Sequence, residues 1–307
     1  MDDMLVHGQP LNKDGTVSLS QSELDKIADK TAQSSSSSTT SSSTTSSSSS
    51  TTSSSSSTTS SQSPSLSPPS PSSQGLLRRR VHIDSELTVE VYELDDPSKL
   101  VHEWMESHSG ADPFGTVYWP GSNLGLRLLK KRLSSIPPNA NILVLGCGTG
   151  VEAIGAASLS PTFKVHALDL NPLALSLLSR AASSSSSLSS RITTERFDLT
   201  SNKPLPLEGV DVVLACDILY NQELAKEVGR RCYECLSLPK PPSLIVTDSQ
   251  RFHGTDFLVE MNARLLVDNR QHENILWETE RLTNITSSGI LVPEDQVYDI
   301  SVRYISV

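Results

Sequence analysis

Three glycines separated by single residues form the segment with the clearest chemical meaning. They are Gly146, Gly148 and Gly150, at the end of the run ILVLGCGTG, which begins at Ile142. The run is apolar and strand-like up to its first glycine, and a helix-like pattern begins at Val151. Such a loop brings backbone N–H groups close to a ligand, and the N-terminus of the next helix adds partial positive charge. We predict a small-molecule binding loop, with a purely structural turn as the alternative.

The spacing of the glycines discriminates among the ligands of such loops. A dinucleotide loop of the Gly-x-Gly-x-x-Gly type needs a third glycine at the position of Val151, so a nicotinamide dehydrogenase is excluded. A P-loop needs Gly-Lys followed by Ser or Thr, and the run lacks that triplet. Gly-x-Gly-x-Gly after a strand is the pattern of S-adenosylmethionine sites, so this cofactor is favoured.

Acidic residues follow the next two predicted strands. Asp169 stands at the end of the segment 164–168, where a carboxylate can accept hydrogen bonds from both hydroxyls of a ribose. Asp198 follows the segment 192–196, where a carboxylate can meet the amino group of adenine. A helix-capping role for Asp169 and an ordinary loop acid at Asp198 are the alternatives.

An acid and an aromatic residue follow the fourth strand of this series. Asp217 and Tyr220 are three residues apart, directly after the apolar segment 210–215. An aromatic loop that contains Trp119 precedes the first strand. Aromatic faces attract cations, and a carboxylate holds them, so these residues indicate a site for a cationic group. Core packing of Trp119 and Tyr220 is the alternative.

Together these motifs resemble the seven-strand S-adenosylmethionine-dependent methyltransferases. Asp217-Ile218-Leu219-Tyr220 is similar to the Asp-x-x-Tyr motif of a family of protein lysine methyltransferases. The segments Phe114–Leu129 and Asp248–Arg251 are similar to the branch of that family that methylates the β subunit of electron-transfer flavoprotein. The resemblance covers about residues 112–250.

The resemblance implies S-adenosyl-L-methionine as cofactor and a lysine side chain of a protein as methyl acceptor. It implies Asp217 and Tyr220 as catalytic residues, with Asp217 holding the arriving ammonium group. Tyr220 and Trp119 would offer it aromatic faces. The residues expected to bind the cofactor are Trp119, Gly146, Cys147, Gly148, Thr149, Gly150, Asp169, Leu170, Asn171, Asp198 and Asp217.

Several positions depart from the pattern of the resembled family. Val144 stands where the first strand of the family carries an acid for the amino group of the cofactor. Ser122 and Asn123 replace Gly and Gln, and Ser249-Gln250 replaces Pro-Gly. Two other functions therefore stay open. One is a methyltransferase of the same fold acting on another protein or a small amine, and the other is a non-catalytic methyltransferase-like binding module.

The elements that position these residues follow from the periodicity of apolar side chains. Strand-like and helix-like segments alternate, which is typical of a mostly parallel sheet covered by helices on both faces. We predict an α/β, Rossmann-like, seven-stranded methyltransferase fold with an antiparallel C-terminal hairpin at the edge of the sheet. The expected strands are 87–94, 142–145, 164–168, 192–196, 210–215, 244–247, 272–279 and 297–305. The expected helices are 97–106, 123–133, 151–158, 172–182, 223–236 and 255–266.

Composition divides the chain into three parts. In residues 34–73, 34 of 40 side chains are Ser or Thr, which leaves almost no apolar surface to offset the entropy of ordering. We expect a disordered linker over 34–74 and a mostly disordered segment over 1–33 with a short helix near 23–30. The methyltransferase domain would then occupy 75–307. A second serine run at 183–190 is expected to be a surface loop.

Charge and cysteine usage limit the partners. The formal net charge is −10, which disfavours binding to nucleic acid because phosphate backbones need clustered Lys and Arg. The basic run Arg78-Arg79-Arg80 is expected to be a solvated entry segment. Cys232 and Cys235 fall in a predicted helix and are expected to be buried thiols, so we predict no metal site.

The remaining expectations concern location and assembly. No apolar run approaches the ~20 residues that span a bilayer, so no membrane partner is expected. Residues 1–33 contain acidic side chains and no arginine, unlike a mitochondrial transit peptide. We expect a cytoplasmic monomer. The mitochondrial matrix, where the substrate of the resembled branch resides, is the alternative location.

Overall fold

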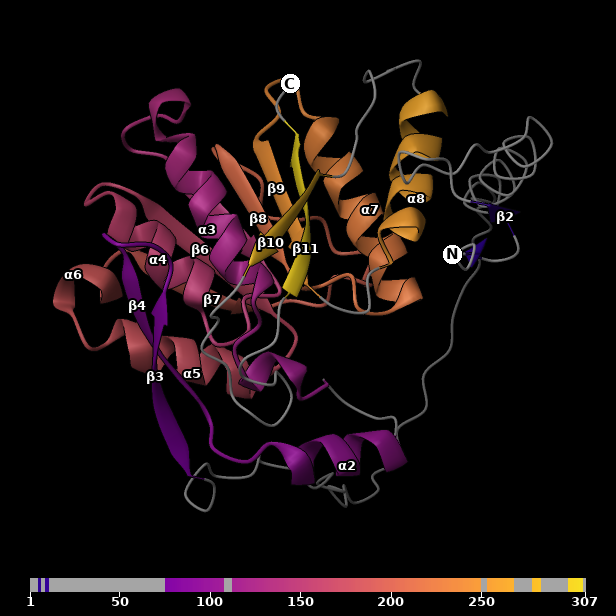
Figure 1. The fold of residues 1–307 in the computed structure, drawn as a ribbon. Coiled ribbons are helices and arrows are strands. Elements are labelled where there is room, and N and C mark those ends of the chain that lie inside the picture. The colour runs from indigo at the N-terminus through magenta and orange to yellow at the C-terminus, as the bar shows by residue number, and fades with distance from the viewer. Residues whose placement is uncertain are drawn as a thin grey trace, which may run out of the picture. The chain divides into compact units, whose positions relative to one another are not determined.

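A seven-stranded sheet organises residues 74–307 of the computed structural model (Figure 1). The strand order is β10-β11-β9-β8-β5-β6-β7. β5 to β9 run parallel, while β11 is antiparallel to β9 and β10 is antiparallel to β11. The bounds are β5 Asn141–Leu145, β6 Lys164–Asp169, β7 Ile192–Arg196, β8 Val212–Cys216, β9 Ser243–Asp248, β10 Glu278–Leu282 and β11 Tyr298–Ile305. This topology confirms the predicted fold class.

The structure describes residues 75–107, 112–249 and 253–267, together with four further strands. Two of these are β10 and β11. The other two are β1 (Leu5–Val6) and β2 (Gln9–Pro10), which pair antiparallel within a separate unit, residues 1–73. The linker predicted over 34–74 and the helix predicted near 23–30 lie outside the described residues, which resume at residue 75.

Helices cover both faces of the sheet. The helices are α2 Ser98–Ser107, α3 Gly121–Lys131, α4 Val151–Leu159, α5 Pro172–Ala182, α6 Ser186–Ser189, α7 Gln222–Leu236 and α8 Gly254–Val267. Single 3-10 turns lie at Phe114–Thr116 and Leu133–Ser135. A separate antiparallel hairpin, β3 (Leu76–His82) with β4 (Thr88–Leu94), packs against α4 and α5. None of the helices in the described part of the chain is long and apolar enough to cross a membrane.

The core has two halves because the side chains of the central strand alternate between its faces. Ile142 and Val144 of β5 pack with α3, α4 and α5, whereas Leu143 and Leu145 pack with α7 and α8. Cys232 and Cys235 of α7 belong to the second half as buried free thiols, as predicted. A parallel strand that is buried on both faces has a continuous run of apolar residues. This run is why β5 could be predicted from the sequence.

Four local predictions differ from the structure. α3 begins at Gly121, two residues earlier than predicted, directly after Pro120. β10 lies at Glu278–Leu282 and so continues past the predicted strand 272–279, of which residues 272–277 lie outside the described part of the chain. The serine run 183–190 is not only a loop, because it contains the short helix α6. The strand β3 was not predicted at all, since its three consecutive arginines obscure the alternation of its apolar side chains.

The arginine run is part of this hairpin rather than a solvated entry segment. Arg78 and Arg80 form ion pairs with Glu90 at the surface. Arg79 is only 8% exposed and forms an ion pair with the fully buried Glu93. The carboxylate of Glu93 also accepts a hydrogen bond from the backbone N–H of Tyr118, at 3.1 Å. This buried pair therefore ties the hairpin to the aromatic loop that precedes α3.

The two kinds of arginine give a matched test. Replacing Arg79 by methionine leaves the Glu93 carboxylate buried without its cation, so the free energy of unfolding should fall by about 3–5 kcal/mol. Arg78→Met removes an exposed pair and should change that free energy by less than about 1 kcal/mol. Urea denaturation of both variants measures the difference. Equal losses in the two variants would contradict the structural role of the buried pair.

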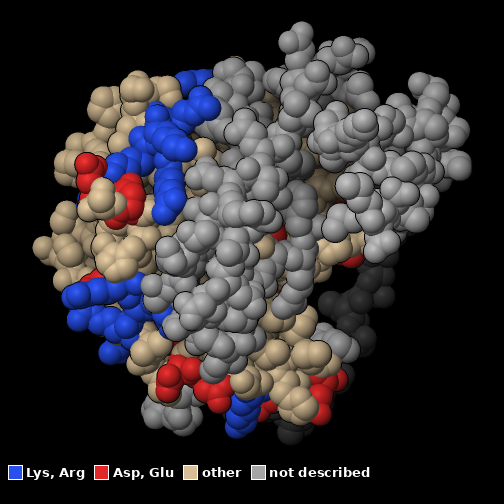
Figure 2. Space-filling view, viewed as in Figure 1, with Lys and Arg blue, Asp and Glu red and all other residues tan. Residues whose placement is uncertain are grey.

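Surface cations elsewhere are also paired with acids. Lys130 of α3 lies 2.9 Å from Asp84 and 2.7 Å from Glu86. On the face drawn in Figure 2, the Lys and Arg side chains at the upper left lie next to Asp and Glu side chains. The positive charge of this face is therefore partly neutralised by neighbouring carboxylates.

Candidate functional site

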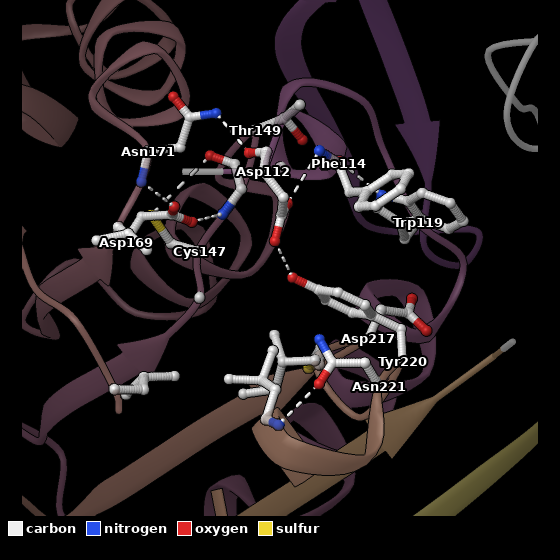
Figure 3. Close-up of a pocket in the computed structure, with 18 of the residues that line it drawn as sticks. Asp112, Phe114, Trp119, Cys147, Thr149, Asp169, Asn171, Asp217, Tyr220 and Asn221 are labelled. Carbon is white, nitrogen blue, oxygen red and sulfur yellow. Dashed lines mark hydrogen bonds between the residues drawn. The ribbon is translucent and has the colours of Figure 1, made fainter. Parts of the chain in front are cut away.

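A cavity of about 340 Å³ opens at the carboxyl ends of β5, β6, β7 and β8 (Figure 3). In open α/β sheets, ligands bind at the carboxyl ends of the strands, at the point where the strand order reverses. In this sheet that point is β5, with β6 on one side and β8 on the other. All predicted site residues line the cavity except Gly150. The residues that do so are Trp119, Gly146, Cys147, Gly148, Thr149, Asp169, Leu170, Asn171, Asp198, Asp217 and Tyr220.

The glycine loop follows a path that other residues could not adopt without strain. Gly146, Gly148 and Gly150 have φ values of 63°, 49° and 90°, in the left-handed region that glycine tolerates best. A Cβ atom at Gly146 would lie 2.6 Å from Ile218, and one at Gly150 would lie 2.4 Å from Leu178. Gly150 precedes the first turn of α4 and shapes the loop without lining the cavity.

Asp169 fixes this loop from the neighbouring strand. Its carboxylate accepts hydrogen bonds from the backbone N–H groups of Gly148 and Asn171, both at 2.8 Å. Burial raises the pKa of Asp169 to about 6, although these two hydrogen bonds oppose the increase. The cap of α5 is provided by Asn171, whose side chain accepts the N–H of Leu173. The capping alternative for Asp169 is therefore wrong, and its carboxylate keeps acceptor positions for hydroxyl groups.

Asp112 connects two walls of the cavity and had no role in the sequence analysis. Its carboxylate accepts hydrogen bonds from the hydroxyl of Tyr220 and from the backbone N–H of Phe114. Its backbone carbonyl accepts a hydrogen bond from the side chain of Asn171 at 2.8 Å. In Figure 3 the hydroxyl of Tyr220 points to Asp112 across the cavity wall. The only sequence signal for this residue is the dipeptide Asp112-Pro113, which is typical of the start of a turn.

Phe114 is the centre of an aromatic cluster beside Asp112. Its ring makes edge contacts with Trp104, Trp119 and Tyr220 at centroid distances of 5.6, 6.3 and 5.8 Å. The indole N–H of Trp119 donates to the backbone carbonyl of Phe114 at 2.8 Å. Trp119 and Tyr220 are thus half-buried at the cavity rather than enclosed in the core.

Asp217 holds three elements together. It adopts a left-handed backbone conformation with φ of 54°. Its carboxylate accepts hydrogen bonds from the backbone N–H of Gly121 and from both the N–H and the hydroxyl of Ser249, the last two at 2.6 and 2.7 Å. Burial raises the pKa of Asp217 to about 6. The backbone N–H of Ser122 is a further donor to this carboxylate, so its roughly four acceptor positions are engaged and Asp217 presents its negative charge to the cavity.

Glu152 is a second acid at this end of the cavity, and the sequence analysis did not select it. It lies in the first turn of α4, is 3% exposed and lines the cavity. Its Oε1 accepts the hydroxyl of Ser122 at 2.6 Å, and it also contacts the thiol of Cys216. Burial raises the pKa of Glu152 to about 7, and the nearby charge of Asp217 acts in the same direction. The overlooked signal is a single charged residue in the otherwise uncharged helix VEAIGAASL.

Asp198 lies at the opposite end of the cavity, after β7. Its Oδ1 accepts hydrogen bonds from the N–H and hydroxyl groups of Thr200 at 2.9 and 2.7 Å. The side chain is half-buried and lines the cavity. Its second oxygen keeps acceptor capacity for a ligand, so both the turn-forming role and the predicted binding role are compatible with this position.

The raised pKa of Glu152 predicts how the unliganded chain responds to pH. Its folded-state pKa lies above the ordinary value of 4.5, so the folded chain binds more protons than the unfolded chain between about pH 4.5 and pH 7. Stability from this group is therefore lost as the pH rises through that window. Glu152→Gln should have little effect near pH 4.5 and increase the free energy of unfolding by about 1–3 kcal/mol near pH 8.

Urea denaturation of the wild type and the Glu152→Gln variant at several pH values measures this difference. Because the variant and the wild type share all other titrating groups, their difference isolates Glu152. A difference that is the same at every pH would contradict the assigned ionisation.

Comparison with known proteins agrees with this geometry. Residues 142–237 match a methyltransferase domain family. The chain is also similar to the electron transfer flavoprotein beta subunit lysine methyltransferase of Danio rerio, with 28% identity over 134 residues. That match covers 40% of this chain and 45% of the zebrafish protein, so the similarity spans less than half the length of the curated relative.

Solved structures with a similar arrangement are more distant. TrmN from Thermus thermophilus is 21% identical, with a TM-score of 0.38, over 61% of this chain and 49% of that one. CrArsM, an arsenic(III) S-adenosylmethionine methyltransferase from Chlamydomonas reinhardtii, is 14% identical, with a TM-score of 0.37, over 60% and 72% of the two chains. The fold assignment therefore rests on the strand order of the sheet itself, and the family match over residues 142–237 supports a methyltransferase domain in this chain.

Proposed function

We propose that this chain is an S-adenosylmethionine-dependent protein-lysine N-methyltransferase. The observation that carries the proposal is the carboxylate of Asp169 bound to the N–H of Gly148, at the edge where β5 and β6 end beside the cavity. A loop whose glycines adopt left-handed backbone conformations, together with an acid on the next strand, suits a nucleoside ligand. The methyltransferase domain match over residues 142–237 supports the same class of reaction.

The cavity fits this cofactor at each of its parts. Asp169 has acceptor positions for a ribose diol, and Asp198 has one for the amino group of an adenine. Phe197 and Leu199 flank Asp198 and give the cavity an apolar lining at that end. The glycine loop leaves space for the backbone of the chain to approach the ligand closely.

When bound, S-adenosylmethionine supplies an electrophilic methyl group on a sulfonium. The acceptor amine must be neutral, although a lysine in water has a pKa of ~10.4. The half-buried rings of Trp119 and Tyr220 restrict water around an entering side chain, and removal of water lowers the pKa of an amine. The negative charge of the Asp217 carboxylate would attract the amine and orient its N–H groups. Positioning of this kind accounts for much of the acceleration in group transfer.

The substrate proposal rests on similarity together with the chemistry of the cavity. The relative from Danio rerio is named for the beta subunit of electron transfer flavoprotein, and the Asp217–Tyr220 motif resembles the same family. We therefore propose this flavoprotein subunit as the methyl acceptor. Acidic and aromatic lining suits a cationic side chain, which is consistent with lysine as the modified residue.

Two measurements on the full chain test the function. Calorimetry should show binding of S-adenosylmethionine, and Asp169→Asn should weaken it at least about tenfold because a charged acceptor for the ribose is lost. Incubation with radiolabelled cofactor and the purified flavoprotein subunit should then label lysine. Absence of binding would refute every enzymatic proposal for this chain. Binding with label only on small amines, or only on another protein of a cell extract, would refute the proposed acceptor.

Asp217 and its partner Ser249 allow the charge of Asp217 to be separated from its structural role. At saturating cofactor, Asp217→Asn should reduce methyl transfer more than about tenfold, because the amine loses a charged hydrogen-bond acceptor. Ser249→Ala removes one hydrogen bond to Asp217 but keeps its charge. This variant should retain most of the transfer rate while losing about 1 kcal/mol of stability. Undiminished transfer in Asp217→Asn would remove Asp217 from the mechanism.

A further inference from the structure

Glu152 and Asp217 are two acids at the same end of the cavity. Both line it, and the charge of Asp217 raises the pKa of Glu152. Within the described residues, no ion pair joins either carboxylate to Lys, Arg or His. Their partners are instead neutral donors: Ser122 for Glu152, and Gly121 and Ser249 for Asp217. A pair of neighbouring carboxylates without a cation is a site that attracts one.

The strand order fixes which end of the cavity this is. β5 lies between β8 on one side and β6, followed by β7, on the other. Asp169 is the last residue of β6, and Asp198 follows β7. Glu152 instead contacts Cys216 at the end of β8 and Ser122 at the start of α3. A ligand with its ribose at Asp169 and its adenine near Asp198 therefore extends its other end across β5 toward Glu152.

On this placement, and on the basis of the proposed function, we propose that Glu152 binds the α-ammonium group at the amino-acid end of S-adenosylmethionine. Ser122 holds Oε1 of the carboxylate at 2.6 Å and so fixes its orientation. The strand β5 carries no charged side chain, and its residue Val144 is 1% exposed and packs in the core away from the cavity lining. Glu152 supplies from α4 the negative charge that β5 does not provide.

The cost of ionising the buried Glu152 carboxyl also favours a role in binding a cation. A buried carboxyl without a cation lowers the stability of the folded chain when it ionises. A purely structural role would be served as well by an uncharged side chain that accepts the Ser122 hydroxyl. An incoming ammonium group both neutralises the carboxylate and offsets its repulsion with Asp217.

A series of ligands separates the amino-acid end from the nucleoside. S-adenosylmethionine and S-adenosylhomocysteine both carry the α-ammonium group, whereas 5′-methylthioadenosine lacks the amino-acid portion. Calorimetry on the full chain near pH 8 should show that Glu152→Gln weakens binding of the first two by about tenfold to a hundredfold. Its affinity for 5′-methylthioadenosine should change less than about twofold. Glu208→Gln, at an exposed position outside the cavity, is the matched control and should leave all three affinities unchanged.

A second variant tests the orientation of the Glu152 carboxylate. Ser122→Ala keeps the carboxylate but removes its orienting hydrogen bond, so it should weaken only the two amino-acid ligands, by about threefold. This variant decides the question if Glu152→Gln does not fold. Equal losses for all three ligands, or no loss for the first two, would overturn the assignment of Glu152. Failure of the wild type to bind any of the three would instead refute the proposed function.

Discussion

The close approach of α3 to the end of β8 is the constraint on which the site depends. Two glycines of α3 permit it: a Cβ atom at Gly121 would lie 2.6 Å from the carboxylate of Asp217, and one at Gly125 would lie 2.5 Å from the thiol of Cys216. In this arrangement the N–H of Gly121 donates to Asp217, and its carbonyl accepts the hydroxyl of Thr247. The start of α3 is therefore anchored to both β8 and β9.

This anchor positions the polar groups on one side of the cavity. Ser122 follows Gly121 directly, so the position of α3 sets the hydroxyl that hydrogen-bonds to Glu152. On the other side, the segment before α3 is held by the buried carboxylate of Glu93 through the N–H of Tyr118, and by Asp112 through Tyr220 and Asn171. The residues from Asp112 to Ser122 thus form a wall whose two ends are attached to different parts of the domain.

The sequence predicted well those features that depend on residues near each other in the chain. The helix α5 and the strand β7 match their predicted bounds, because apolar periodicity is a local property. Asp169 and Asp217 could be selected because each directly follows a strand, and parallel strands end at one edge. The spacing of Gly146, Gly148 and Gly150 similarly indicated the loop without any knowledge of its partners.

The residues that were missed depend on contacts between distant parts of the chain. Ser122 and Glu152 are 30 residues apart, and Asp112 and Tyr220 are 108 residues apart, so no local pattern reports either pair. Arg79 resembles its two exposed neighbours in sequence, and only pairing of β3 with β4 turns it toward Glu93. Burial of a charged group is decided by its partner, which periodicity does not reveal.

The two carboxylates beside β8 act on each other, and this links the two proposed binding events. The charge of Asp217 raises the pKa of Glu152, and by reciprocity an ionised Glu152 disfavours ionisation of Asp217. A cation bound at Glu152 removes that repulsion and lowers the pKa of Asp217, which then carries its full charge at neutral pH. Occupation of the cofactor site would therefore prepare Asp217 for a second cation, the amine of the substrate.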